Sequence, residues 1–320
     1  MSHALDHTAL STTTAAVGPV WHNASPTATT RLIPSPRSTG VARVGRRFAA
    51  KPVHLAWPPQ ASQRVRIDVL GAEIDAINMG AAVRRIADWA GANLSRTVCA
   101  CNVHVAVTAR SDRRLSDALA TADLVVADGA PIAWLMRHDG HTAQHRVAGP
   151  DLMWNYFIAA EERRQPIYLY GGSEQTLVAL VARIARDLPG LEVAGTHSPP
   201  YRELTEEEDD AVVASINASG AKTVWVALGC PRQEAWLAAH RSRVDAVMIG
   251  VGAAFNFHAG SMARAPLWMQ RHSLEWLHRL VCEPRRLARR YAVTNSKFVV
   301  LAALRLLRRE LPGTVRRSGE

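Results

Sequence analysis

Short apolar runs rich in β-branched side chains recur along the 320-residue chain and alternate with segments of helical periodicity. Such runs are typical of strands buried on both faces of a parallel sheet, with the intervening helices packed on either side. The pattern predicts an α/β fold with a doubly wound, mostly parallel, Rossmann-like sheet. About six strands are expected, over Arg96 to Cys101, Leu124 to Ala127, Pro166 to Ser173, Leu191 to Gly195, Thr223 to Gly229 and Ala246 to Gly252.

Polar residues and glycines stand where several of these runs end. Asp128 and Gly129 follow the run that ends at Ala127, and Pro131 suits the first turn of the next helix because that position needs no amide donor. In an open α/β sheet, ligands bind at the edge formed by the carboxyl ends of the strands. Asp128 is therefore a candidate for chemistry at that edge, although the local pattern taken alone favours a helix-capping role.

Two further motifs could contribute to the same edge. Gly171-Gly172 at a strand-to-helix junction could present amides and a helix dipole to an anion, or could form a tight turn and nothing more. Gln233 and Glu234 at a helix start could recognise a base or sugar by hydrogen bonds, or could be capping groups. The acidic run from Thr205 is interpreted as a capping box at a helix start rather than a metal site.

The positive charge lies at the two ends of the chain. The formal net charge is +10, with +6 on residues 1–64 and +8 on residues 279–320, which leaves −4 for the part between them. Basic ends suit a polyanion such as an anionic membrane or a nucleic acid. Because no helix-turn-helix, zinc-finger or aromatic RNA-binding signature accompanies them, a membrane surface is favoured and no nucleic acid is expected.

Three domains are predicted. Residues 1–64 form a disordered basic arm, because the segment is rich in Ser, Thr, Pro and Ala without apolar periodicity. Residues 65–272 form the α/β core. Residues 273–320 form a basic helical appendage, in which Val300, Leu304, Leu307 and Leu311 make an apolar stripe beside Arg305, Arg308 and Arg309. That stripe is typical of an interfacial helix, although docking on the body or on a second subunit is the alternative. No apolar run is long enough to span a membrane.

Several signatures of other chemistries are missing. The nearest match to a dinucleotide fingerprint, Gly250-Val251-Gly252, comes late in the chain and lacks its third glycine. Neither a P-loop nor the nucleophile elbow of α/β-hydrolases is present. The four cysteines lack the paired spacing of a zinc site and are expected to be reduced: Cys99, Cys101, Cys230 and Cys282.

The polar positions form a series of short motifs in a fixed order. The series is Asn102, Ala127-Asp128-Gly129, Arg146-x-x-Gly-x-Asp151, Tyr170-Gly171-Gly172, Leu228-Gly-x-Pro-x-Gln233-Glu234, Gly250-Val-Gly-Ala-Ala-Phe255, Arg264-Ala-Pro266, Leu274-Glu275-Trp276-Leu277-x-Arg279 and Glu283-Pro-x-Arg286. In this order and spacing, over roughly Val65 to Tyr291, the sequence resembles the WecG/TagA/CpsF glycosyltransferase family.

The resemblance implies transfer of a sugar from a UDP-sugar to a polyprenyl-diphosphate-linked saccharide, with inversion and without a catalytic metal or cofactor, at the cytoplasmic face of the membrane. The sugar would be a hexose, an N-acetylhexosamine or a uronic acid for a surface polysaccharide or teichoic acid. Asp128 matches the family's candidate general base. Donor and substrate binding falls to Asn102, Arg146, Asp151, Gly171, Gly172, Gln233, Glu234 and Asn256, and diphosphate or lipid binding to Arg264, Arg285, Arg286, Arg289 and Arg290.

Two positions depart from the family pattern. Ala100 stands where members often have Thr, and Asn256 stands where they usually have Asp, which leaves altered sugar preference or an inactive relative as alternatives. A nucleotide-cofactor oxidoreductase and a basic nucleic-acid-binding protein are the rival functions from other classes. A homo-oligomer is compatible with the sequence.

Overall fold

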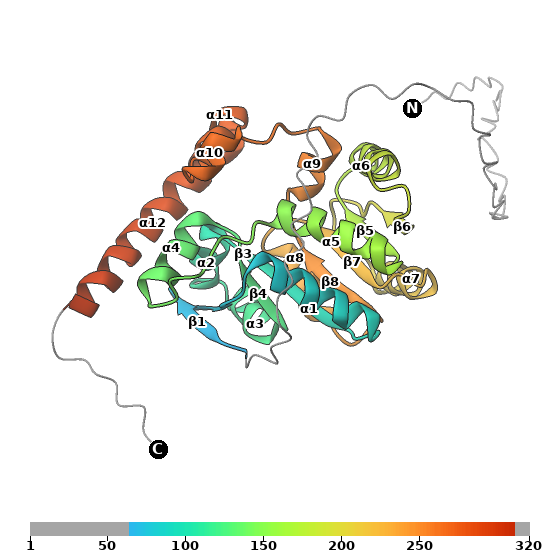
Figure 1. Cartoon of the computed structure of the whole chain (residues 1–320), viewed down its shortest axis with the longest axis horizontal. Coiled ribbons are helices and arrows are strands. Elements are labelled where there is room, and N and C mark those ends of the chain that lie inside the picture. Colours follow the sequence, from blue (N-terminus) through green and yellow to red (C-terminus); the bar gives the residue numbers. More distant parts are fainter. Residues whose placement is uncertain (1–63, 311–320) are drawn as a thin grey trace, which may run out of the picture. The chain divides into compact units, whose positions relative to one another are not determined.

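The computed structural model describes residues 64–310 and shows the predicted α/β architecture (Figure 1). Six strands form one sheet in the order β4-β3-β8-β7-β5-β6, and every neighbouring pair is parallel. An antiparallel hairpin, β1 and β2, precedes it. The strands are β1 (Arg66–Val69), β2 (Ala72–Asp75), β3 (Arg96–Cys101), β4 (Leu124–Ala127), β5 (Ile167–Gly171), β6 (Val193–His197), β7 (Thr223–Ala227) and β8 (Val247–Gly250).

Helices cover both faces of this sheet. They are α1 (Met79–Gly91), α2 (Val103–Ala109), α3 (Arg113–Thr121), α4 (Ala130–His138), α5 (Gly149–Arg163), α6 (Glu174–Asp187), α7 (Glu206–Ala218), α8 (Arg232–Ala239), α9 (Ala254–Ala259), α10 (Leu267–Arg271), α11 (Glu275–Cys282) and α12 (Pro284–Glu310). The predicted doubly wound sheet is confirmed. The disordered arm predicted for residues 1–64 lies outside the described residues apart from Arg64.

The alternation of side chains along β3 shows how one strand serves two cores. Val98 and Ala100 pack with α1, α5 and α6 on one face of the sheet. Cys99 and Cys101 point to the other face, where α2, α3, α4, α7 and α8 pack. Successive side chains of a strand point to opposite faces, so a run buried on both sides must be apolar throughout. All four cysteines are free in the structure.

Two helices, α2 and α3, fill the segment between β3 and β4. The second begins where the Asp112 carboxylate caps it by accepting from the Leu115 amide. The glycine-rich segment after β8 contains the short helix α9. The capping box of Thr205 and Glu208 is present as predicted, so the acidic run there begins α7.

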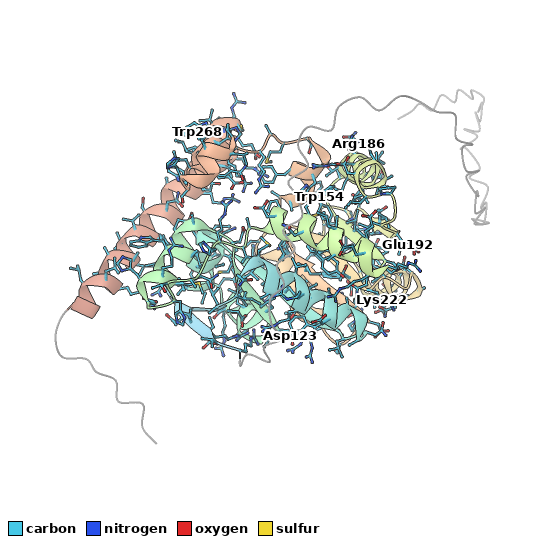
Figure 2. The ribbon with its side chains drawn as sticks, in the orientation of Figure 1. Asp123, Trp154, Arg186, Glu192, Lys222 and Trp268 are labelled. Atoms are coloured by element: carbon cyan, nitrogen blue, oxygen red, sulfur yellow. The ribbon has the colours of Figure 1, made fainter. Side chains whose placement is uncertain are left out.

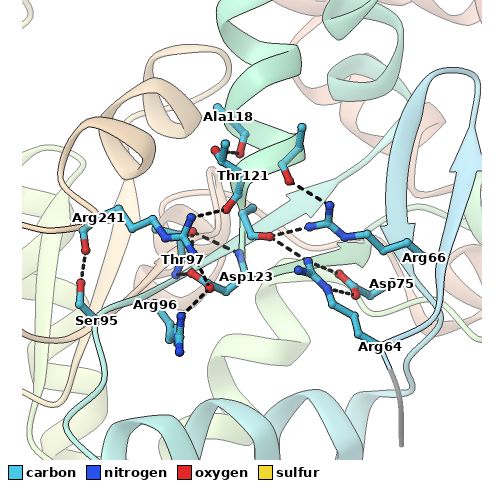
Figure 3. Close-up of polar contacts among 12 residues, drawn as sticks. Arg64, Arg66, Asp75, Ser95, Arg96, Thr97, Ala118, Thr121, Asp123 and Arg241 are labelled. Atoms are coloured by element: carbon cyan, nitrogen blue, oxygen red, sulfur yellow. Dashed lines mark hydrogen bonds and ion pairs between the residues drawn. The ribbon is translucent and has the colours of Figure 1, made fainter.

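Buried carboxylates pin the edge of the sheet formed by the amino ends of the strands (Figure 3). Asp75 on β2 accepts from the Val125 amide at 2.7 Å and is paired with Arg64. Asp123 is paired with Arg96 from β3 and with Arg241 from the turn after α8. Each guanidinium neutralises a carboxylate that would otherwise be costly to bury. The charged side chains at this edge therefore form structural ion pairs. The opposite edge is the candidate for ligand binding.

Helix α12 docks on the body through one face and exposes the other. Phe298 and Ala302 are buried in the core beside α2, and Arg305 donates to Asp68 at 3.0 Å and to Asp139 at 2.5 Å. Of the predicted apolar stripe, Val300, Leu304 and Leu307 lie on the exposed side and are 57, 46 and 58% exposed, whereas Leu311 lies outside the described residues. Docking on the body is thus observed, while the predicted stripe stays accessible. No helix within residues 64–310 is both long and apolar enough to cross a membrane.

Candidate active site

A cavity of about 880 Å³ opens at the carboxyl edge of the sheet. The loops that follow β3, β4, β5, β7 and β8 form its floor and walls, and α11 and α12 contribute a further wall. The loops therefore converge on one crevice, as the common position of the strand ends predicts. Nine of the predicted site residues line it: Asn102, Asp128, Arg146, Gly172, Gln233, Glu234, Asn256, Arg286 and Arg290.

Asp128 directly follows β4 and its carboxylate is held from two sides. Its Oδ1 accepts from the Gly149 amide at 3.0 Å, at the first turn of α5, and its Oδ2 accepts from the Asn102 side chain at 3.4 Å. The helix-capping role that the local pattern favoured is wrong, because Gly129 occupies the N-cap of α4 and no side chain caps that helix. The carboxylate instead accepts from an amide at the start of α5 and lines the cavity.

Asn102 is oriented by the helix that it begins. Its Oδ1 accepts from the amides of His104 and Val105 at 3.0 and 3.2 Å, which caps α2. Because those amides can only donate, the oxygen of the Asn102 amide must face them and its nitrogen must face Asp128. Asn102 therefore acts as a fixed donor to the carboxylate.

The cavity holds Asp128 in a state from which it can gain a proton. Burial raises the pKa of Asp128 from 3.8 to about 6, while the hydrogen bonds from Gly149 and Asn102 and the charge of Arg146 oppose that rise. A carboxylate with a pKa near the working pH can accept a proton and release it again. This is the property that a general base requires.

Four charged side chains form a network beside Asp128. Arg146 donates to Glu275 of α11, with 2.8 Å between Nη1 and Oε2. Arg264 makes a two-pronged pair with Asp151, at 2.6 and 2.8 Å, and its Nε lies 3.8 Å from Oε1 of Glu275. Asp151 and Arg264 are not among the residues that line the cavity within the described part of the chain. They pair with each other, and in this structure they connect to the cavity through Glu275.

The glycine pair after β5 serves packing as well as the cavity. Gly171 has φ +105°, and a Cβ there would stand 2.7 Å from the Ala227 carbonyl oxygen, so only glycine fits between β5 and β7. Gly172 lines the cavity, but its amide donates to that same carbonyl at 3.2 Å. The Gly172 amide is therefore hydrogen-bonded within the fold. Gly171 does not contribute to the lining formed by residues 64–310.

Gln233 and Glu234 are buried at the start of α8. Gln233 accepts from the Gly252 amide at 2.8 Å and donates to Glu234 at 3.2 Å, so it links α8 to the loop after β8. Burial raises the pKa of Glu234 above its ordinary value. Gly250 makes room for this pair, since a Cβ there would stand 2.5 Å from the Gln233 amide. Asn256 and Thr176 also line the cavity, and Asn256 accepts from Thr176 at 3.5 Å.

The arginine cluster of α12 divides between two helix faces. Arg286 and Arg290, four residues apart, line the cavity, whereas Arg285 and Arg289 do not belong to the lining within residues 64–310. Leu287 and Phe298 are buried where the helix docks, which fixes its rotation. Two of the four predicted cluster residues are thereby brought to the site.

Other cavity residues had no assigned role. Arg279 and Glu275 belong to a motif already noted in the sequence, but nothing local to it shows that they face Arg146 or the cavity. His104 follows Asn102, and burial and the charge of Arg290 lower its pKa to about 4, so its imidazole is neutral at pH 7. Tyr201, 96% exposed at the rim, follows Pro199 and Pro200 and carried no sequence signal.

The fold and the cavity define an α/β protein with a cavity at the carboxyl edge of a parallel sheet, lined by the carboxyl groups of Asp128, Glu234 and Glu275 and by several arginines. Comparison with known proteins identifies the family. The model of the glycosyl transferase WecG/TagA/CpsF family matches residues 67–312, well over half of the chain. The chain therefore belongs to this family, and it is a glycosyltransferase by membership.

Two curated relatives carry the same name, N-acetylglucosaminyldiphosphoundecaprenol N-acetyl-beta-D-mannosaminyltransferase. The protein of Bacillus spizizenii strain W23 is 29% identical over 210 residues, which is 65% of this chain and 80% of the relative. That of Bacillus subtilis strain 168 is 30% identical over 201 residues, which is 62% of this chain and 77% of the relative.

Proposed function

We propose that this glycosyltransferase moves a sugar from a UDP-sugar to a polyprenyl-diphosphate-linked saccharide, with Asp128 as general base. The observation that carries the proposal is the Asp128 carboxylate, held by Gly149 and Asn102 with a pKa of about 6 in an arginine-lined cavity. The names of the relatives, which act on a diphosphoundecaprenol-linked sugar, support this class of acceptor.

In the proposed reaction the acceptor hydroxyl attacks C1 of the donor sugar from the side opposite UDP. Asp128 takes the hydroxyl proton as the new C1–O bond forms, and the old bond to the diphosphate breaks with its electron pair leaving on UDP. The departing charge is neutralised by guanidinium groups of the cavity, namely Arg146, Arg279, Arg286 and Arg290. A single base with attack from the far side gives inversion at C1.

The donor is tested by a screen for UDP release. The purified protein is incubated with a lipid-diphosphate N-acetylglucosamine acceptor and with UDP-hexoses, UDP-N-acetylhexosamines and UDP-uronic acids in turn. The names of the relatives make the N-acetylhexosamine donors the first choice. We expect acceptor-dependent UDP release with one donor class, and product analysis should show inversion. If no donor supports release above the acceptor-free background, the proposed reaction is wrong.

Ligand binding separates this function from the rival enzyme class. UDP should raise the melting temperature of the protein, because a ligand that binds only the folded state stabilises it. NAD should not. Protection by NAD without protection by UDP would favour the oxidoreductase instead.

We also propose that the protein associates peripherally with the cytoplasmic face of the membrane through α10, α11 and α12. Leu267, Trp268 and Val281 are 68, 58 and 73% exposed, and the outer stripe of α12 adds further apolar side chains. Figure 2 shows Trp268 at the α10 end of this region. Exposed apolar side chains next to arginines suit an anionic bilayer surface. A lipid-linked acceptor would be presented at that surface.

A further inference from the structure

The carboxylate of Glu275 is paired with an arginine that lines the cavity. The Glu275 carboxylate also lines the cavity and accepts from Arg146 at 2.8 Å, and the two side chains are only 17 and 22% exposed. Arg146 is one of the cations available to a diphosphate in the proposed function. In the structure this cation is paired with a side chain from α11, 129 residues away in the sequence.

A second partner for Glu275 stands next to the first. The Nε of Arg264 is buried and makes no hydrogen bond within the described residues, although the rest of that guanidinium is bound to Asp151. It lies 3.8 Å from Oε1 of Glu275, an ion-pair distance that is too long for a hydrogen bond. A buried donor of this kind gains free energy when an acceptor reaches it.

We propose that Glu275 is a displaceable carboxylate, which holds Arg146 until the diphosphate of the donor takes its place and which then moves to the Nε of Arg264. This inference rests on the proposed function, because it assumes a diphosphate ligand at Arg146. The exchange leaves both guanidinium groups paired before and after binding. No buried charge is left without a partner at either stage, which keeps the cost of the exchange small.

The arrangement has a consequence for affinity that distinguishes it from a structural ion pair. A ligand that must displace a carboxylate binds more weakly than it would to a free guanidinium. Replacing Glu275 by the isosteric Gln should therefore strengthen binding of a diphosphate. If Glu275 only held α11 in place, the same substitution would loosen the cavity wall and weaken binding.

The experiment measures dissociation constants by isothermal titration calorimetry with UDP, inorganic pyrophosphate and uridine. Glu275→Gln should bind UDP and pyrophosphate about three- to tenfold more tightly than the unmodified protein. Affinity for uridine, which has no phosphate, should not change. Glu73→Gln is the matched control, because it removes the same charge from an arginine pair on the β1–β2 hairpin. It should leave all three constants unchanged.

A double-mutant cycle tests whether the effect runs through Arg146. In an Arg146→Gln background, Glu275→Gln should no longer strengthen UDP binding. Equal or weaker UDP binding by Glu275→Gln in the otherwise unmodified protein would overturn the inference while leaving the proposed function intact. If neither UDP nor pyrophosphate binds the unmodified protein, the proposed donor class fails, and the inference fails with it.

Discussion

Asp128 is the residue at which burial and chemistry oppose each other. Burial makes its charged form costly, and the amide of Gly149 and the side chain of Asn102 recover only part of that cost. A surface aspartate would be cheaper to ionise but would be a weaker base, because its pKa would lie far below the working pH. Burial at this position therefore lowers the free energy of unfolding and raises the pKa of the base. Three separate measurements test these effects.

Asp128→Asn should lower turnover by about 10²- to 10⁴-fold, because the amide keeps the shape of the side chain but cannot accept the acceptor's proton. UDP affinity should persist, since the arginines that would hold the diphosphate are unchanged. Steady-state kinetics and titration with UDP on the same preparation measure the turnover and the UDP affinity. Turnover close to that of the unmodified enzyme would remove Asp128 from the role of base.

The same carboxyl group should set the acid limb of the pH profile. The base must be ionised in the free enzyme, so kcat/KM should rise with pH and level off above the Asp128 pKa of about 6. The groups that share its surroundings include Arg146, Glu275 and Arg264. His104, with a pKa of about 4, should not titrate in this range. An acid limb near the ordinary aspartate value of 3.8 would contradict the assignment.

The free energy of unfolding should change with pH in the direction opposite to kcat/KM. Because the pKa of Asp128 is higher in the folded state, the folded protein binds more protons between pH 3.8 and about 6, and the free energy of unfolding falls as pH rises through that range. Asp128→Asn removes this loss. The variant should therefore gain on the order of 1–3 kcal/mol relative to the unmodified protein between about pH 4 and about pH 8. Urea unfolding at the two pH values measures it, and no change with pH would refute it.

Helix α12 packs on the body of the protein with one face and is exposed to solvent on the other. Its inner face contributes Phe298 to the core and Arg290 to the cavity, while its outer face carries the stripe of Val300, Leu304 and Leu307. A truncation that removes the helix would open the core and the cavity together. Its exterior role can be tested only by substitutions that leave the docked face untouched.

The triple variant Val300→Gln, Leu304→Gln, Leu307→Gln should therefore lose binding to anionic vesicles, by about tenfold or more, with little change in melting temperature. Vesicle sedimentation measures the bound fraction. Val65→Gln, Leu94→Gln, Val178→Gln is the matched control, because these apolar side chains are also exposed but do not belong to α10, α11 or α12. Equal vesicle binding by both triple variants and the unmodified protein would mean that the stripe is not a membrane face.

At the scale of the whole molecule, local sequence patterns predicted the features that depend only on residues close together in the sequence. The strand ending at Ala127 was predictable from a short apolar run, and Asp128 from its place after it. The partner of Asp128 was not, because Gly149 lies 21 residues further on and meets the carboxylate only once α5 packs. The capping alternative failed for the same reason.

Long-range pairing limited the prediction of the rest of the site. Asp151 and Arg264 belong to recognisable motifs, yet nothing in either motif shows that they bind each other rather than a ligand. The arginines of α12 were visible as a cluster, but the rotation of the helix is set by which side chains dock, and this selects Arg286 and Arg290. Contacts of this kind depend on tertiary packing, which no local window contains.

The distribution of charge around the cavity leads to the last prediction, that turnover does not require a divalent metal ion. The leaving diphosphate needs positive charge, and Arg146, Arg279, Arg286 and Arg290 place guanidinium groups from three separate segments around one cavity. Full turnover should therefore persist in EDTA. It should fall as salt is raised, because the arginines are partly exposed and their attraction for the diphosphate is screened. Strict dependence on added Mg²⁺ or Mn²⁺ would show that the arginines alone do not neutralise the leaving group, and UDP affinity insensitive to salt would show that they contribute little to holding it.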